Sequence, residues 1–150
     1  MKYRLEQNKQ ENEVIIRYTQ WNEEIERLVQ FLEQKFEANR LMGRENGEKV
    51  LLEYKDILYF ESVDKGTYAY TRKTVAKVEE SLTFYEGALT AYGFYRCSKS
   101  MVINIYQIRK LKSESGNRIL ATMENGENVM ISRRFAKGLR EVLKGGNRHE

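Results

Sequence analysis

The sequence predicts a mainly β fold with short helices, of the α+β class. Short apolar runs of strand length fill most of the chain after residue 40, and glycine-containing turns separate them. Asn46-Gly47 and Asn125-Gly126 each lie between two such runs, and Asn-Gly is the strongest short-range signal for a β-hairpin. Asp64-Lys65-Gly66 supplies a further turn. Because hairpins join neighbouring antiparallel strands, we expect antiparallel sheets.

The first 48 residues are predicted to form a ββα extension. Residues 3–7 and 13–18 alternate in part between apolar and polar side chains, so we expect them to pair as a hairpin. Thr19 is then placed to cap a helix. Apolar side chains recur every three or four positions along one face of this helix: Trp21, Ile25, Leu28, Leu32 and Phe36. This face must be buried, either on the rest of the chain or on a second copy.

The second predicted domain, residues 49–150, is rich in β-strands and carries small helices at its edge. Thr83 and Glu86 have the spacing of a capping box, which favours a short helix there. Ser132 is suited to cap a last helix over residues 133–144. From residue 41 onward the predicted strands lie at 41–45, 49–54, 57–62, 67–71, 94–97, 101–105, 108–112, 118–123 and 128–131.

The residue types that most enzymes and metal sites need are nearly absent. The one histidine, His149, lies in the C-terminal tail, and the one cysteine, Cys97, lies within a predicted strand as a small buried hydrophobe. No Walker or GxGxxG motif indicates a nucleotide cofactor. We therefore expect no catalytic residue, no metal, no cofactor and no enzymatic activity. A single cysteine and the lack of an apolar run of roughly 18 residues predict a soluble cytoplasmic protein.

Positive charge is concentrated in the second predicted domain. Residues 1–48 carry 8 Lys and Arg against 10 Asp and Glu, whereas residues 49–150 carry 18 against 12. Residues 96–118 and 133–148 hold most of the excess. Such clusters indicate a polyanionic partner, with nucleic acid as the first candidate. A solvated, lysine-rich surface is the alternative at this point.

The last predicted helix begins with Arg133 and Arg134, which is an unfavourable place for positive charge. The helix dipole opposes each cation in the first turn by roughly a few tenths of a kcal/mol. Two arginines beside unpaired backbone N–H groups, however, make a good arrangement for binding phosphate. We therefore interpret the pair as functional, and an ion pair with a nearby carboxylate such as Glu127 is the alternative.

Four sequence blocks together strongly resemble the LytTR DNA-binding domain, the output domain of many bacterial regulators. Their order and spacing both match the family, over about 90 residues between Ile57 and Leu143. The blocks are residues 57–62, Ser81-Leu82, residues 94–104, and Asn125-Gly126 followed by residues 131–135. The resemblance implies an elongated stack of antiparallel β-sheets with short helices. It also implies that loops, rather than a recognition helix, enter successive major grooves of double-stranded DNA.

Carried over by position, three segments are implied to contact DNA. Their residues are Lys65, Thr67, Ser98, Lys99, Arg133 and Arg134. Lys99 and Arg134 are expected to read bases, because Lys and Arg bind guanine in the major groove. Lys65 and Arg133 are expected to contact phosphates.

Three more positions belong to the matched region. Arg96 and Lys137 are further candidates for phosphate contact, with a structural ion pair as the equal alternative for Arg96. Asn104 matches a signature position, and we interpret it as structural, closing the turn into the next strand. Many relatives have His-Arg where this chain has Ser98-Lys99. Because lysine lacks the planar fork of arginine, we expect weaker discrimination of guanine at that point.

The resemblance also implies partners: promoter DNA with paired direct repeats, a second copy at least on DNA, and a membrane-protein controller. Residues 1–48 are too short for a phospho-acceptor receiver domain and lack its acidic pocket, so phosphorylation is not expected to switch the protein. Two other functions stay open. A β-rich RNA-binding module would need exposed aromatic side chains such as Tyr68 and Tyr70. A protein-interaction domain would have no nucleic-acid role.

Overall fold

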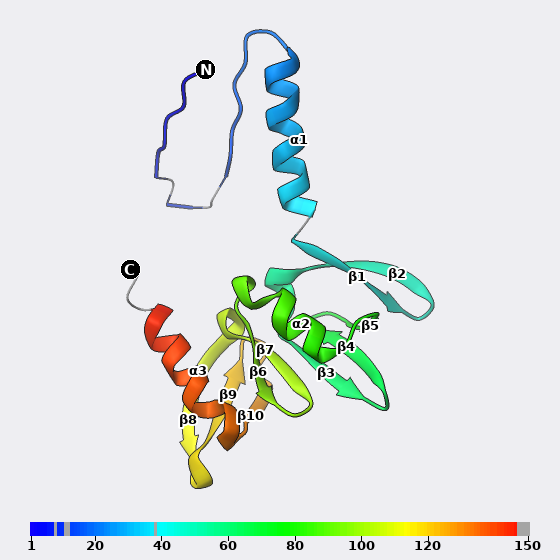
Figure 1. Ribbon diagram of the computed structural model, residues 1–150, viewed down its shortest axis with the longest axis vertical. Coiled ribbons are helices and arrows are strands. Elements are labelled where there is room, and N and C mark those ends of the chain that lie inside the picture. The colour runs from blue at the N-terminus through cyan, green and yellow to red at the C-terminus, as the bar shows by residue number, and fades with distance from the viewer. Residues whose placement is uncertain (8, 11–12, 38, 147–150) are drawn as a thin grey trace. The chain divides into compact units, whose positions relative to one another are not determined.

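The computed structural model describes residues 1–7, 9–10, 13–37 and 39–146 (Figure 1). The chain divides into two compact units, Met1–Phe36 and Glu37–Glu150. This division lies earlier than the boundary predicted after residue 48. The reason is that β1 (Arg40–Glu45) pairs along its whole length with β2 (Glu48–Glu53), so both strands belong to the second unit.

The first unit is built on helix α1 (Glu23–Glu37), and its described residues form no strand. The hairpin predicted over residues 3–7 and 13–18 is therefore wrong. An isolated two-stranded hairpin is at best marginally stable in water, and alternation along the chain does not by itself provide a third strand or a covering layer.

Helix α1 begins at Glu23, because Asn22 and not Thr19 caps it. The Oδ1 atom of Asn22 accepts a hydrogen bond from the backbone N–H of Ile25 at 2.9 Å. Asn is at least as good an N-cap as Thr. Trp21 consequently precedes the helix and is 52% exposed, whereas Ile25, inside the first turn, is buried.

The second unit contains two antiparallel sheets, and every pair of neighbouring strands in them is antiparallel, as predicted. The larger sheet has the strand order β2-β1-β5-β4-β3-β7-β6, with β3 (Tyr59–Val63), β4 (Gly66–Tyr70), β5 (Val75–Val78), β6 (Phe94–Ser98) and β7 (Met101–Asn104). The smaller sheet has the order β10-β9-β8, with β8 (Ile108–Glu114), β9 (Arg118–Met123) and β10 (Asn128–Ile131). Two helices complete the unit, α2 (Leu82–Ala88) and α3 (Arg133–Gly146) (Figure 1).

The apolar run at residues 57–60 enters the middle of the larger sheet and is buried on both faces, with no side chain more than 6% exposed. Ile57 and Phe60 belong to the hydrophobic cluster that α2 covers, where the rings of Phe60 and Tyr85 stack with centroids 4.4 Å apart. Leu58 and Tyr59 belong to a second cluster, which also contains side chains of the smaller sheet and of α3. The larger sheet is therefore the middle layer of this unit.

Helix α2 begins at Leu82, one residue before the predicted cap at Thr83. Ser81 is the cap, since its Oγ atom accepts a hydrogen bond from the backbone N–H of Phe84 at 3.2 Å. Leu82 and Tyr85 are buried in the cluster under the helix, so burial of these two side chains fixes where the first turn lies.

Asn104 is a buried polar side chain, 1% exposed, that joins two parts of the larger sheet. Its Nδ2 atom donates a hydrogen bond to the carbonyl of Ile57 at 2.8 Å, and its Oδ1 atom accepts one from the backbone N–H of Tyr106 at 3.0 Å. The structural role predicted for Asn104 is confirmed. It closes the turn after β7 and satisfies the carbonyl of the segment that leads into β3.

Replacing Asn104 by Ala should lower the free energy of unfolding by about 1–3 kcal/mol, because both partners lose their hydrogen bond inside the protein. Gln107→Ala is the matched control. The Nε2 atom of Gln107 also donates to a carbonyl, that of Lys55 at 2.6 Å, but this bond is exposed and water can replace it. Urea unfolding followed by circular dichroism measures both variants, and equal losses would contradict the role assigned to Asn104.

Candidate nucleic-acid interface

The turn between β3 and β4 holds Lys65 at its tip. Asp64 and Lys65 have φ angles of 48° and 67°, and Val63 pairs with Gly66 across them, as in a two-residue hairpin turn with two positive φ values. Positive φ is uncommon for a lysine. Lys65 is exposed, whereas Thr67 lies inside β4 and is only 8% exposed. The burial of Thr67 does not support its predicted contact with DNA.

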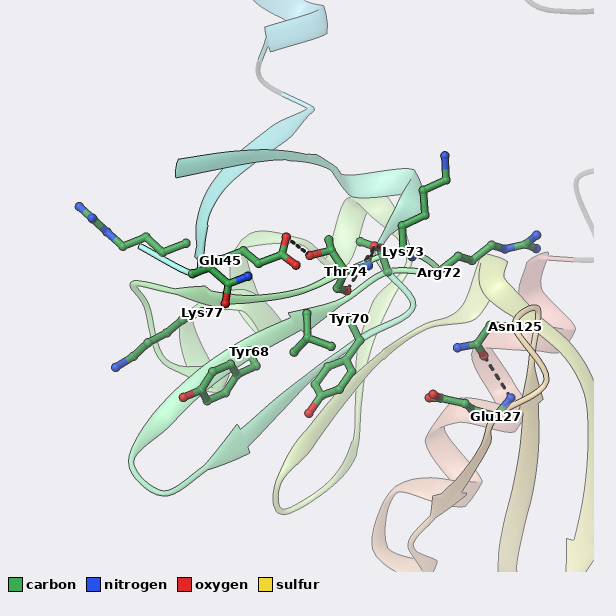
Figure 2. A pocket seen from close by; sticks show the side chains of 13 residues that line it. Glu45, Tyr68, Tyr70, Arg72, Lys73, Thr74, Lys77, Asn125 and Glu127 are labelled. Carbon is green, nitrogen blue, oxygen red and sulfur yellow. Dashed lines mark hydrogen bonds between the residues drawn. The ribbon is translucent and has the colours of Figure 1, made fainter. Parts of the chain in front are cut away.

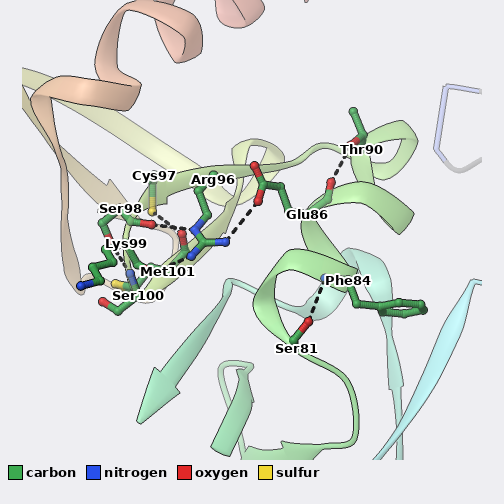
Figure 3. A network of polar contacts seen from close by, with 10 residues as sticks. All are labelled: Ser81, Phe84, Glu86, Thr90, Arg96, Cys97, Ser98, Lys99, Ser100 and Met101. Atoms are coloured by element: carbon green, nitrogen blue, oxygen red, sulfur yellow. Dashed lines mark hydrogen bonds and ion pairs between the residues drawn. The ribbon is translucent and has the colours of Figure 1, made fainter. Parts of the chain in front are cut away.

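The loop between β6 and β7 follows Ser98, the last residue of β6, and contains Lys99; Arg96 holds it in place (Figure 3). The Nε atom of Arg96 donates to the carbonyl of Ser98 at 2.8 Å, and its Nη2 atom donates to the carbonyl of Lys99. Its Nη1 atom forms an ion pair with Glu86 of α2 at 3.1 Å. All three guanidinium nitrogens have partners, and the side chain is 17% exposed. Of the two alternatives for Arg96, the structure therefore supports the structural ion pair.

Helix α3 begins beside this same loop. The backbone N–H of Ser132 donates to the carbonyl of Cys97 at 2.9 Å, so Arg133 lies next to the residues that follow Cys97. Ala136 and Leu139 are 1% and 2% exposed in the second hydrophobic cluster and fix the helix on the sheet. Burial of these side chains therefore determines where the start of α3 lies.

The three predicted contact segments lie at one end of the larger sheet. Ser62, at the end of β3, donates its backbone N–H to the carbonyl of Ser100 at 2.8 Å, which ties the β3–β4 hairpin to the β6–β7 loop. We call this region the loop end, made of Lys65, Ser98, Lys99, Arg133, Arg134 and Lys137. Its Lys and Arg side chains are exposed, and no carboxylate of the described residues forms an ion pair with them. The loop end therefore concentrates uncompensated positive charge.

The sequence did not indicate Glu86 as the partner of Arg96. The two residues are ten positions apart, and their contact exists only because α2 packs beside β6. By contrast, Ser132 was predicted as the residue before the last helix from its side chain alone. Its backbone link to Cys97 depends on the packing of α3 and has no local signal.

Residues 47–144 match the family model described as the LytTr DNA-binding domain. This match covers well over half of the chain. The chain belongs to the LytTr DNA-binding domain family. It is therefore a DNA-binding transcriptional regulator, as the sequence resemblance predicted.

Other comparisons agree with this assignment. Over 136 residues the chain is 26% identical to an HTH-type transcriptional regulator of Staphylococcus aureus (strain bovine RF122 / ET3-1), covering 91% of this chain and 92% of that protein. A regulator of the same description from strain MRSA252 gives the same values. Among solved structures, the LytTr DNA-binding domain of a methyl-accepting/DNA response regulator from Bacillus cereus matches with a TM-score of 0.67 and 25% identity, covering 70% of this chain and 96% of that one.

The helices of this LytTr protein are not arranged as a helix-turn-helix pair. In that motif two helices are joined by a turn of roughly three or four residues. Here five strands separate α1 from α2, and five more separate α2 from α3. Exposed positive charge lies in two loops and in the first turns of α3, which agrees with loop-based contact, and also on strand β8.

A hollow of about 580 Å³ on the larger sheet is lined by tyrosines and charged side chains (Figure 2). Tyr70 stacks there on Tyr59 with ring centroids 4.6 Å apart and donates a hydrogen bond to Glu61 at 3.0 Å. Tyr59 in turn donates to Glu127 at 2.6 Å, and burial together with the Glu127 carboxylate raises the pKa of Tyr59. Tyr70 and Glu127 thus have internal partners. Among the described residues, Glu127 forms no ion pair with Arg133.

Cys97 lies directly before the β6–β7 loop, is fully buried, and donates its thiol to the carbonyl of Met101 at 3.5 Å. Burial raises the pKa of the thiol to about 12.

The described part of the LytTr protein holds no group of three or more metal-ligating side chains. Within the same part, no helix is long and apolar enough to cross a membrane.

Because Cys97 is buried and its pKa is raised, native protein should react with a disulfide reagent at pH 8 much more slowly than unfolded protein. The thiolate is the reactive form, and its fraction falls roughly a thousandfold when the pKa rises by about three. Because the folded pKa lies above the unfolded value, the stabilisation by this thiol is fully present below about pH 9. It is lost as the pH rises toward 12. Absorbance of released thionitrobenzoate, with and without guanidinium, measures the rates; equally fast labelling of native protein would contradict the burial of Cys97.

Proposed function

We propose that this LytTr protein reads double-stranded DNA with the loop end and acts at promoters that carry paired direct repeats. The observation that supports this most is the hydrogen bond between Ser132 and Cys97, which joins Arg133 and Arg134 to the loop with Ser98 and Lys99. Two sequence segments more than thirty residues apart thereby form one exposed cationic surface. A surface of this kind fits the phosphates and the major-groove edges of a duplex.

Within the loop end, we assign different roles to different side chains. Lys99 and Arg134 read base edges, since guanine offers two acceptors in the major groove. Lys65, Arg133 and Lys137 contact phosphates and fix the register of the protein on the duplex. The Arg134 guanidinium also lies 5.2 Å from the centroid of the Phe135 ring, which limits its freedom before DNA binds.

The proposal extends to how the regulator works in the cell. It acts in the cytoplasm by binding alone, without catalysis or a cofactor, and two copies occupy the paired repeats. A membrane protein is the proposed controller. These statements rest on the resemblance to the LytTr family and on the charge pattern of the chain.

Replacing both Arg133 and Arg134 by Ala should raise the dissociation constant for a specific duplex by about 100-fold or more, because a phosphate contact and a base contact are lost together. Arg133→Ala alone should reduce the slope of log K against log salt concentration by about one. Fluorescence anisotropy measures both, using DNA from upstream of the protein's own gene and a scrambled duplex of equal length.

Lys144→Ala is the matched control for this experiment, since Lys144 is an exposed cation in the last turn of the same helix. It should leave the preference for the native duplex unchanged. Circular dichroism confirms that each variant is folded. If the double variant keeps full specific binding, the assignment of the site to the start of α3 is refuted. An equal affinity for an RNA duplex would point to the alternative nucleic-acid function.

Arg96→Lys should weaken DNA binding by about tenfold and leave the salt slope unchanged. Lysine keeps the charge, but its single ammonium cannot hold both loop carbonyls and Glu86 at once. Ordering the loop when DNA binds then costs more free energy, and this cost lowers the affinity. Anisotropy titrations separate this role from phosphate contact, because a lysine would keep a phosphate contact and hence near wild-type affinity. Undiminished affinity of the Arg96→Lys variant would contradict the positioning role.

A further inference from the structure

Strand β2 is an outer strand of the larger sheet, and within the part of the chain that the structure describes only β1 pairs with it. The backbone N–H of Tyr54 donates to the carbonyl of Asn39 at 2.8 Å, and this fixes which residues of β2 face β1. Hydrogen-bonding direction alternates along an antiparallel strand. The backbone N–H and C=O groups of Lys49, Leu51 and Glu53 therefore point away from the sheet, toward an absent neighbour.

The same strand exposes apolar side chains. Leu51 is 62% exposed, and its cross-strand partner Met42 on β1 is 50% exposed. Cross-strand partners lie on the same face, so these two side chains form one apolar patch beside the open edge. Lys49 and Glu53 lie on this face on either side of Leu51, because residues two apart in a strand share a face. An open edge with an apolar face is a ready template for pairing with another strand.

We propose that β2 pairs with β2 of a second copy, antiparallel and about a two-fold axis through Leu51. In this register Leu51 faces Leu51 of the second copy, and Lys49 faces Glu53 of the second copy. All three outward-facing residues then exchange backbone hydrogen bonds across the axis. The two larger sheets become one continuous sheet, and the contact is self-complementary, as a two-fold interface must be.

The charges on β2 favour this occupant and this register. Each dimer contains the Lys49–Glu53 contact twice, and opposite charges directly across an antiparallel pair are stabilising. The partner of Glu53 within one copy is Lys55, at 3.5 Å, in an exposed ion pair that contributes little. The outer strand β8 of the smaller sheet contrasts with β2. Arg109, Lys110 and Lys112 on β8 are all positive and would repel one another across a pair of β8 strands, whereas β2 carries both signs.

This contact is independent of the proposed function. Direct repeats relate neighbouring copies by a shift along the duplex, whereas β2 pairing relates two copies by a two-fold axis. β2 and β6 are also the two opposite outer strands of the larger sheet, so the loop end beside β6 does not take part. Loss of DNA binding and loss of β2 pairing are therefore separate outcomes.

The test exchanges the two charges on the full-length protein and measures its self-association by sedimentation velocity. Lys49→Glu places like charges opposite each other twice in the dimer and should raise the dimer dissociation constant by about tenfold; Glu53→Lys should do the same. The double variant K49E/E53K restores both pairs with reversed polarity and should return to wild-type association. An equimolar mixture of the two single variants should also associate like the wild type, as a heterodimer.

Recovery in both the double variant and the mixture supports the register, because a defect in folding would not be repaired by mixing. Arg109→Glu, an exposed charge change on the outer strand β8 of the smaller sheet, is the control and should have no comparable effect. A wild-type protein that stays monomeric at 100 μM would overturn the proposal. So would a dimer that is indifferent to both charge changes, since its contact would then lie elsewhere, for example in the first unit.

Discussion

Burial of the central strands on both faces is the constraint on which the second unit depends. β3 and β7 lie between β4 and β6 and send apolar side chains to both sides of the larger sheet. Phe60 and Val102 fill one cluster, and Tyr59 and Ile103 fill the other. The short helix α2 closes the first face, but the second face needs a further layer, which the smaller sheet and α3 provide. Closing that face brings the start of α3 to the end of β6.

The same packing explains how α3 tolerates two arginines in its first turn. Each cation there opposes the helix dipole by roughly a few tenths of a kcal/mol, whereas burial of a leucine side chain contributes about 1.5–3 kcal/mol. Leu139 and Ala136 are almost fully buried, so hydrophobic contact outweighs the unfavourable charge. The helix can therefore present Arg133 and Arg134 without a neutralising carboxylate. The proposed site thus lies where local electrostatics is unfavourable and packing is strong.

Local signals in the sequence sufficed for most hairpins of the second unit. Asn46 and Gly47 have φ angles of 51° and 81°, the conformation for which the Asn-Gly pair is selected. The same kind of signal failed in the first unit, because alternation in residues 3–7 does not show whether a third strand exists to cover them. Helix starts were displaced by a few residues where a better cap, Asn22, stood closer to the buried face.

The site was predictable only in part, for a related reason. Lys65, Lys99 and Arg133 are exposed cations at one end of the sheet, as local pattern and family resemblance led us to expect, and their contact with DNA stays a prediction. The 8% exposure of Thr67 was not predictable, since the face of a strand that a side chain occupies depends on which face its sheet buries. The partners of Arg96 were not predictable, because Glu86 meets it only after α2 has packed on the sheet. Contacts of this kind form only in the folded protein, so no local sequence pattern predicts them.

Three hydrogen-bonded links hold the loop end before any DNA arrives. Arg96 binds the β6–β7 loop through two carbonyls, Ser62 binds Ser100, and Ser132 binds Cys97. A mobile loop would lose backbone freedom on binding, and that loss would be subtracted from the affinity. Here only long side chains such as Lys99 must still be ordered, at about 0.5–1.5 kcal/mol each. In the proposed mode of binding, loops can therefore take the place of a recognition helix, because hydrogen bonds to the sheet and to α3 already hold their backbone.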